Sequence, residues 1–411
     1  MATGMEGHGT RMLFPRRALA AAMRLDGVRV LDMTRLLPGP YATQLLADAG
    51  ADVIKVEDTG AGDYARFGEP TTDRGVGRVF DAVNRGKRSV AVDLKDERGR
   101  EAFHRLAADA DVVFESFRPG VVDRLGVGYD DVREHNPDVV YCSLSGYGAD
   151  GPYVDRVGHD LNYVGVAGLL DMTRESPDAA PQIPGYPIAD MAGGLAAAFS
   201  IVGALASREL GNTGGEHVDV AMTDVVASLS HAVAADALEG DDPRPGETRL
   251  TGRYPWYAVY EAADGRHLTL AALEEKFWVA FCSAADREDL IEVHGTEDPD
   301  ELAALHEELE DLFAERPREA WLDLLDDVDA AVGPVNTPAE MVEEPQLSAR
   351  GLIRRPADTP PRVGFPYRSS AGPDATDESI PGHGEHTDEL LGECGYSAEE
   401  VEGLRDDGVV L

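Results

Sequence analysis

Residues 28–32 read Val-Arg-Val-Leu-Asp, a helical pattern runs from Pro40 to Ala49, and residues 52–56 read Asp-Val-Ile-Lys-Val. Short β-branched runs that alternate with longer helical patterns are typical of βαβ units. The alternation continues with strands predicted at 89–94, 111–115 and 139–144 and a helix predicted at 96–108. The sequence therefore predicts an α/β fold with a doubly wound, mostly parallel sheet.

Later segments predict a second, smaller domain. A long helix rich in small apolar residues is expected from Ile188 to Glu209, followed by a strand at 216–222 and a helix to about Leu238. A hairpin (254–260 and 266–272) and acidic helices (300–326) indicate an α+β unit, and a strand at 331–336 leads into the C-terminal segment. We expect the following organisation: a disordered extension (1–22), a large α/β domain (23–238), a linker (239–248), a small α+β domain (249–330) and a C-terminal segment that packs back on the large domain (331–411).

The charge of the chain is strongly negative. Lys+Arg number 37 against 77 Asp+Glu, which gives a net charge of −40, while 43% of the residues are hydrophobic. A folded protein with so acidic a surface repels itself unless salt screens the charge, and it is a poor partner for nucleic acid. Because lysine is nearly absent, we interpret this as adaptation to a high-salt cytoplasm, with an ordinary acidic protein as the alternative. Three of the four lysines, Lys55, Lys87 and Lys95, fall among the first strands, which favours an anionic ligand.

Several classes of protein are disfavoured. Three cysteines without metal-ligand spacing suggest a reducing, cytoplasmic environment and no disulfide framework. No apolar run approaches the ~20 residues of a membrane span. Glycine-rich fingerprints for dinucleotides and nucleoside triphosphates are absent. We therefore expect no metal and no membrane.

Two ionisable residues stand out as candidates for chemistry. His159 follows a glycine, and Asp190 begins the long apolar helix, just before Gly193-Gly194. Taken singly, a lone histidine is usually structural, and an aspartate at a helix start is usually a cap. Together they resemble a site, because free N–H groups in that first turn would hold a developing oxyanion. Glu274 and Glu275 either orient an imidazole or form a solvated acidic pair.

The chain resembles the family III CoA-transferase/racemase superfamily and, within it, the alpha-methylacyl-CoA racemases. The resemblance runs from about Leu25 to Leu411. Its motifs are Pro38-Gly-Pro40, Leu46-Ala-Asp-Ala-Gly-Ala-Asp52, Arg85-Gly-Lys-Arg-Ser89, Asp93-Leu-Lys95, Phe117-Arg-Pro-Gly120, Ser145-Gly-Tyr-Gly148, Gly158-His-Asp-Leu-Asn-Tyr163, Ala189-Asp-Met-Ala-Gly-Gly194 and Ala272-Leu-Glu-Glu-Lys-Phe277.

The resemblance implies roles for these residues. His159 and Asp190 would exchange the α-proton of an acyl-CoA, and Asp160 and Glu274 would hold the imidazole. Racemases carry the histidine of Gly158-His159, which transferases usually lack; in transferases the residue that matches Asp190 is the nucleophile. The contacts implied for coenzyme A are Lys55, Val92, Asp93, Leu94, Lys95, Ser116, Phe117, Arg118, Arg124, Gly158, Leu161, Asn162 and Tyr163. Asp58 stands where racemases usually have an arginine, and Lys55 is the candidate to compensate.

We hold three hypotheses of function. The first is an isomerase that epimerises C2 of 2-methylacyl-CoA thioesters through an enolate, with no cofactor beyond the CoA moiety. The second is a CoA-transferase with Asp190 as nucleophile. The third is a non-catalytic CoA-binding protein. The resemblance also implies an interlocked homodimer in which Glu274 is supplied by either chain, and a role in lipid metabolism; it leaves the acyl chain open.

Overall fold

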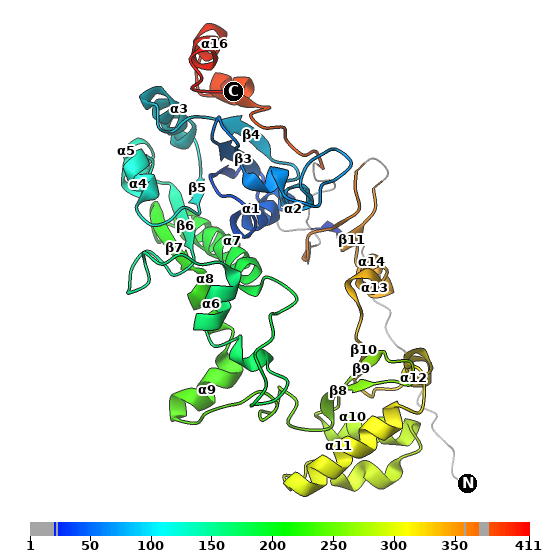
Figure 1. Cartoon of the computed structure of the whole chain (residues 1–411). Coiled ribbons are helices and arrows are strands. Elements are labelled where there is room, and N and C mark those ends of the chain that lie inside the picture. Colours follow the sequence, from blue (N-terminus) through cyan, green and yellow to red (C-terminus); the bar gives the residue numbers. More distant parts are fainter. Residues whose placement is uncertain (1–19, 22–23, 357–358, 370–377) are drawn as a thin grey trace, which may run out of the picture. The chain divides into compact units, whose positions relative to one another are not determined.

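A computed structural model describes residues 20–21, 24–356, 359–369 and 378–411 (Figure 1). The chain divides into two compact units. Unit 1 comprises residues 1–145, 194–220 and 354–411, and unit 2 comprises residues 146–193 and 221–353. The prediction for residues 1–22 lies outside the described residues, except for Ala20–Ala21 (β1), which pairs antiparallel with Arg368–Ser369 (β13).

Unit 1 is built on a six-stranded sheet in the order β4-β3-β2-β5-β6-β7. The pairings β2–β3, β3–β4, β2–β5 and β5–β6 are all parallel. The strands are β2 (Arg29–Asp32), β3 (Asp52–Glu57), β4 (Arg88–Ala91), β5 (Val112–Glu115), β6 (Val140–Ser145) and β7 (Glu216–Ala221). The predicted doubly wound α/β sheet is confirmed. Its order reverses between β2 and β5, and in open α/β sheets ligands bind outside the carboxyl ends of the strands at such a point.

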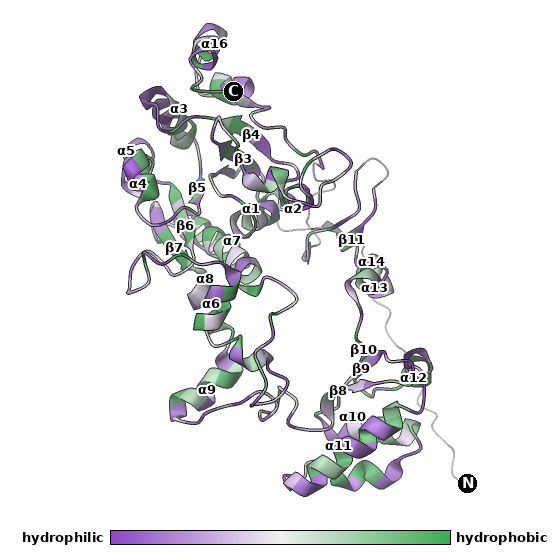
Figure 2. Cartoon of the chain, in the orientation of Figure 1, coloured by the Kyte–Doolittle hydropathy of each residue, from purple (hydrophilic) through white to green (hydrophobic). Residues whose placement is uncertain are grey.

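Helices cover the sheet of unit 1. They are α1 (Pro38–Asp48), α2 (Arg78–Val83), α3 (Glu97–Ala108), α4 (Val121–Leu125), α5 (Tyr129–His135), α15 (Thr387–Glu393), α16 (Ala398–Asp406) and most of α7 (Ile188–Glu209), with the 3₁₀ turn η1 (Tyr64–Phe67). Helix α3 is largely polar in Figure 2 and turns its apolar face, including Phe103 and Leu106, into the core. The same core contains Leu390 and Val410, so the chain's last helices belong to this unit.

Helix α7 is long and apolar enough to cross a membrane by length and composition alone, and 44% of its most apolar window is buried. The central helix of a soluble fold meets the same criteria. Its glycines explain the composition: a Cβ on Gly194 would lie 2.4 Å from the carbonyl oxygen of Pro38, and one on Gly193 would lie 2.5 Å from Met222. Small residues therefore let other chain segments approach this helix closely.

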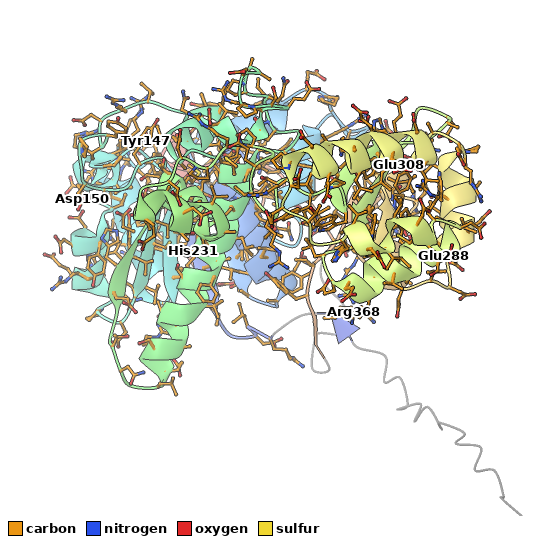
Figure 3. The ribbon with its side chains drawn as sticks, turned by 90° about the horizontal axis from the view of Figure 1, so that it is seen from below. Tyr147, Asp150, His231, Glu288, Glu308 and Arg368 are labelled. Atoms are coloured by element: carbon orange, nitrogen blue, oxygen red, sulfur yellow. The ribbon has the colours of Figure 1, made fainter. Side chains whose placement is uncertain are left out.

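Unit 2 contains helices and a small sheet. The helices are α6 (Asp160–Val166), α8 (Met222–Ser228), α9 (His231–Glu239), α10 (Glu275–Ala284), α11 (Pro299–Phe313), α12 (Arg318–Leu325), α13 (Pro338–Met341) and α14 (Pro345–Ala349), with 3₁₀ turns η2 (Asp171–Thr173) and η3 (Glu288–Val293). The antiparallel sheet has the order β10-β9-β8, formed by Val332–Pro334, His267–Ala271 and Tyr257–Glu261. Trp278, Phe313 and Trp321 lie in its core, and Glu288 and Glu308 lie exposed on the outside (Figure 3). A two-stranded pair, β11 (Ile353–Arg354) with β12 (Arg362–Val363), follows in the sequence.

The domain boundaries differ from those predicted. Residues 146–193 and 221–238 group with unit 2, whereas 23–238 were expected to form one domain. Strand β10 pairs with β9, so residues 331–353 stay with unit 2, and only the chain from Arg354 onward joins unit 1. The helix expected up to Leu238 is broken at Leu229-Ser230 into α8 and α9. Linear patterning shows where elements lie, but not which core each of them joins.

Candidate active site

A turn that follows β2 lies at the reversal of strand order in unit 1. Arg35 in this turn donates from Nη2 to Asp58 Oδ2 at 2.7 Å, and its guanidinium carbon lies 5.5 Å from the ring centres of Tyr64 and Phe117. Phe117 follows β5, so the two loops of the reversal point meet at this guanidinium. Arg35 was not among the predicted contacts; its position directly after the first strand is the signal that would have found it.

Asp58, which replaces the expected arginine, is held in place. Its Oδ1 accepts hydrogen bonds from the backbone N–H groups of Gly60 and Gly62 at 2.9 and 3.2 Å. Burial acts to raise the pKa of this carboxyl, but the two N–H groups and Arg35 outweigh it and lower the pKa below its usual value. Asp58 is therefore an anion that orients Arg35, and a cation remains at this end of the sheet.

Lys55 does not compensate for the missing arginine. It is fully buried: its Nζ lies 2.9 Å from Asp63 Oδ2 and donates to the carbonyl of Thr34 at 3.0 Å. A phosphate cannot reach an ammonium that is enclosed and paired in this way. The prediction that Lys55 contacts coenzyme A is wrong, and the residue instead supports the turn that carries Arg35.

Lys87 completes this buried support. Its Nζ lies 3.2 Å from Asp32 Oδ2 and donates to the carbonyl of Pro40 at 3.1 Å. Burial lowers the pKa of Lys87 to about 8. Burial acts to raise the pKa of Asp32, but Lys87, Lys55 and two threonine hydroxyls lower it to about 2. Two of the three lysines that cluster in the sequence, Lys55 and Lys87, therefore belong to a buried network of ion pairs and hydrogen bonds and do not face a ligand.

The other cations predicted for phosphate are accessible. Lys95, Arg118 and Arg124 are exposed after β4, after β5 and in α4, and within the described part of the chain no side chain forms an ion pair with them. Ser116 and Phe117 are half-buried beside Arg118, and Asp93 and Leu94 are half-buried before Lys95. Val92 is 1% exposed, so its side chain belongs to the core and only its backbone is left for a ligand. These residues line the carboxyl ends of β4 and β5.

The predicted acid/base residues lie together in unit 2. His159 is exposed immediately before α6, and Asp190 is half-buried in the first turn of α7. Asp160 joins them: its Oδ1 accepts hydrogen bonds from the backbone N–H groups of Ala189 at 2.6 Å and Asp190 at 3.1 Å. These two N–H groups, which we expected to be free for an oxyanion, are therefore occupied. Asp160 caps α7, and no hydrogen bond joins its carboxylate to the imidazole of His159 among the described residues.

Asp190 is an unusually basic carboxylate. Burial, reinforced by repulsion from Asp160 and opposed by His159, raises its pKa to about 6. A general acid or base works best when its pKa is close to the working pH. Asp190 is thus suited to exchange a proton near neutrality.

The segment that carries His159 is fixed by Tyr163. Its hydroxyl donates to the carbonyl of Gly158 at 2.6 Å, and the side chain is 7% exposed. A Cβ on Gly158 would lie 2.7 Å from this ring, and one on Gly146 would lie 2.3 Å from it. Tyr163 is therefore packed in the interior, which leaves only its backbone available to coenzyme A. Leu161 and Asn162 are exposed, and Asn162 Oδ1 accepts the His159 N–H at 3.0 Å.

Glu274 makes no hydrogen bond or ion pair with this pair among the described residues. It is exposed at the N-cap position of α10. The same residues contain no group of three or more His, Cys, Asp or Glu that could hold a metal ion.

Comparison with known proteins identifies the family of this chain. The family model "CoA-transferase family III" matches residues 25–387. Human alpha-methylacyl-CoA racemase is 32% identical over 394 residues, which cover 94% of this chain and 98% of that protein. Succinyl-CoA:mesaconate CoA-transferase of Haloarcula hispanica is 36% identical over 396 residues, which cover 90% of this chain and 96% of that protein. A crystal structure of a CaiB/BaiF family protein from Brucella suis superposes with a TM-score of 0.79 at 32% identity and covers 91% of this chain and 100% of that one. This chain therefore belongs to CoA-transferase family III.

Proposed function

We propose that this enzyme epimerises C2 of 2-methylacyl-CoA thioesters. The observation that carries the proposal is the His159–Asp160–Asp190 arrangement. Asp160, the residue after His159, accepts the backbone N–H groups of Ala189 and Asp190, and the charge of His159 acts on the Asp190 carboxyl. Proton transfer at one carbon needs a base on one face and an acid on the other, and these two side chains supply them.

The reaction has two steps. The neutral imidazole of His159 removes the α-proton, the C–H electron pair moves into the Cα–C bond, and the thioester oxygen becomes an enolate. Protonated Asp190 then donates its proton to the opposite face of Cα, which regenerates the thioester with inverted configuration. In the reverse direction Asp190 is the base and imidazolium His159 is the acid. The pKa of Asp190 near 6 keeps both of its forms populated at near-neutral pH.

We propose that coenzyme A is held at the carboxyl ends of β4 and β5. Lys95, Arg118 and Arg124 are exposed cations in a chain of net charge −40, which otherwise repels an anionic ligand. Arginine and lysine are the side chains that best hold phosphate. Arg35 lies between the two loops at the sheet reversal and is a fourth candidate.

We further propose that two copies of the chain form a homodimer in the cytoplasm. Helix α9 has no buried residue in the single chain, and Leu238 on it is 86% exposed. Phe199 on α7 is 78% exposed and Leu210 just beyond it 77%. A short helix draws its stability from packing, so α9 requires a partner. In this arrangement Glu274, whose carboxylate is exposed, orients His159 of either chain. Light scattering tests it: a monomer at working concentration contradicts the proposal.

A CoA-transferase is the second candidate, because the Haloarcula hispanica transferase is as similar to this chain as the racemase is. In that reaction ionised Asp190 attacks the thioester carbonyl, CoA leaves, and an acyl anhydride forms. A raised pKa reduces the ionised fraction of Asp190, which favours the role of proton carrier.

The deciding experiment is incubation with a 2-methylacyl-CoA in heavy water at high salt, followed by mass spectrometry. Deuterium at Cα together with inversion of C2 is expected for the wild-type chain and for the control His267→Gln, whereas His159→Gln and Asp190→Asn should no longer invert C2. No exchange despite bound substrate would contradict the racemase. If His159→Gln remains active in CoA transfer to a free acid, and hydroxylamine traps an Asp190 adduct, the protein is a transferase. Binding without either reaction identifies a non-catalytic CoA-binding protein.

A further inference from the structure

Glu115 is a buried carboxyl directly beneath a predicted contact of coenzyme A. It ends β5, is 4% exposed, and its Oε2 accepts the backbone N–H of Phe117 at 2.7 Å. The turn that it closes contains Ser116, and Arg118 follows directly after it. Glu115 therefore fixes the conformation of the segment through which we expect β5 to contact phosphate.

A chain of hydrogen bonds connects this carboxyl to solvent. Ser143 lies opposite Glu115 in the register of β6, and its hydroxyl bonds to the carboxyl. The Oγ of Ser143 lies 3.0 Å from Nε2 of His217, which is exposed on β7. The imidazole is held by stacking on Tyr129, with ring centres 5.3 Å apart, and by the edge of Tyr141.

The surroundings of Glu115 disfavour its charge. Burial is the largest effect, and together with Asp123 of α4 and Asp219 of β7 it raises the pKa of Glu115 to about 7, although Ser143 and the Phe117 N–H act to lower it. No cation pairs with Glu115 among the described residues. Its ionisation therefore falls within the physiological range of pH.

We propose that Glu115, Ser143 and His217 form a proton-conducting chain that makes the Ser116–Arg118 segment bind anionic ligands more tightly when Glu115 is protonated. The proposal rests on the binding of coenzyme A at this end of the sheet. Glu115 is a positioning residue: it holds the segment through the Phe117 N–H and acts on a bound phosphate only at a distance, through its charge.

The proton balance of the chain is simple. Imidazolium His217 donates its Nε2 proton to Ser143 Oγ while the hydroxyl proton of Ser143 passes to Glu115, which leaves neutral histidine and a neutral carboxyl. Loss of this last proton above neutral pH leaves Glu115 as a net negative charge beneath the segment. A buried charge is poorly screened, so it repels the phosphates of the ligand. By linkage, binding of the ligand takes up protons near pH 7.

Titration calorimetry of the full chain with dephospho-coenzyme A tests the proposal, because this probe lacks the phosphomonoester that itself titrates between pH 6 and 7. From pH 6 to pH 8 we expect Kd of the wild-type chain to rise about fivefold, an estimate for one charge about 10 Å from a phosphate. Glu115→Gln keeps the hydrogen-bond acceptor but cannot ionise, so its Kd should stay at the low-pH value. In Ser143→Ala the carboxyl loses the donor that stabilises its charge, which should move the rise to higher pH.

The control is Glu101→Gln, an exposed change on α3 that should leave the wild-type pH dependence intact. Wild-type dependence in Glu115→Gln overturns the proposal. If the variants do not fold, proton uptake measured on the wild-type chain in two buffers of different ionisation enthalpy decides, and the absence of uptake at pH 7 overturns it. Failure of the wild-type chain to bind coenzyme A at any pH instead overturns the proposed function.

Discussion

The carboxylate of Asp160 accepts the backbone N–H of Asp190 at 3.1 Å and so places two acidic groups at one helix start. Removing the charge of Asp160 should make Asp190 less basic, because repulsion from Asp160 helps to raise its pKa. In Asp160→Asn the pKa should fall below about 6. The amide oxygen still accepts the N–H groups, so the helix cap remains.

The measurement is the pH dependence of kcat in the direction in which Asp190 is the base. There kcat rises with pH through the Asp190 pKa, so the rise in Asp160→Asn should occur at lower pH than in the wild-type chain. Asp160→Ala removes charge and cap together and should also lower the maximal kcat. An unshifted profile in the asparagine variant would show that Asp160 acts by its geometry alone.

Tyr163→Phe removes the hydroxyl that holds the Gly158 carbonyl next to His159. We expect kcat to fall about fivefold with little change in KM, since one buried hydrogen bond is worth about 1 kcal/mol. Tyr153→Phe is a matched control on the neighbouring aromatic cluster. Equal loss in both variants would contradict a specific role for Tyr163.

Arg118→Gln should raise KM for an acyl-CoA about tenfold and leave kcat nearly unchanged, because a phosphate contact contributes equally to substrate and transition state. Lys55→Met gives the contrasting result: lower stability to urea, since Asp63 is left buried without its cation. A KM effect in Lys55→Met with unchanged stability would show that its amine does reach the ligand.

Lys87→Met should destabilise unit 1 by about 3–5 kcal/mol, the typical cost of leaving one partner of a buried ion pair uncompensated. Adding Asp32→Asn should restore much of the loss, because the stranded charge is gone. Urea unfolding of both single variants and the double variant measures this coupling. The exposed pair Arg105–Glu101 is the control and should contribute at most about 0.5 kcal/mol.

Stability should rise with salt. Screening of a net charge of −40 reduces self-repulsion, so unfolding free energy is expected to increase by about 2 kcal/mol or more between about 0.2 and 2 M KCl. Sorbitol at matched osmolality is the control for solvent exclusion. A stability that does not respond to KCl would indicate an ordinary acidic protein.

The sheet could be predicted because its strands alternate strictly with helices, and β2, β3 and β5 lie within one or two residues of their predicted bounds. Helix α7 was predicted with its exact ends, since its composition changes sharply on both sides.

The parts that could not be predicted depend on contacts between distant residues. The sequence of a strand does not show whether a lysine amine faces a phosphate or the core. For this reason Lys55 was wrongly predicted to contact the ligand. Asp160 looked like a support for the adjacent imidazole, yet its partners lie at the start of α7. In the sequence, Glu115 is only the last residue of a predicted strand. Its partner Ser143 becomes visible only in the pairing of β5 with β6.

The burial of Lys55 and Lys87 also determines which lysine amines of the folded chain can react with an electrophile. Of its four lysines, these two are sealed, whereas Lys95 and Lys276 are exposed. An amine-directed reagent should therefore modify two lysines in the folded chain and reach the other two only when unit 1 opens. The buried amines thus report unfolding of unit 1 without any introduced label.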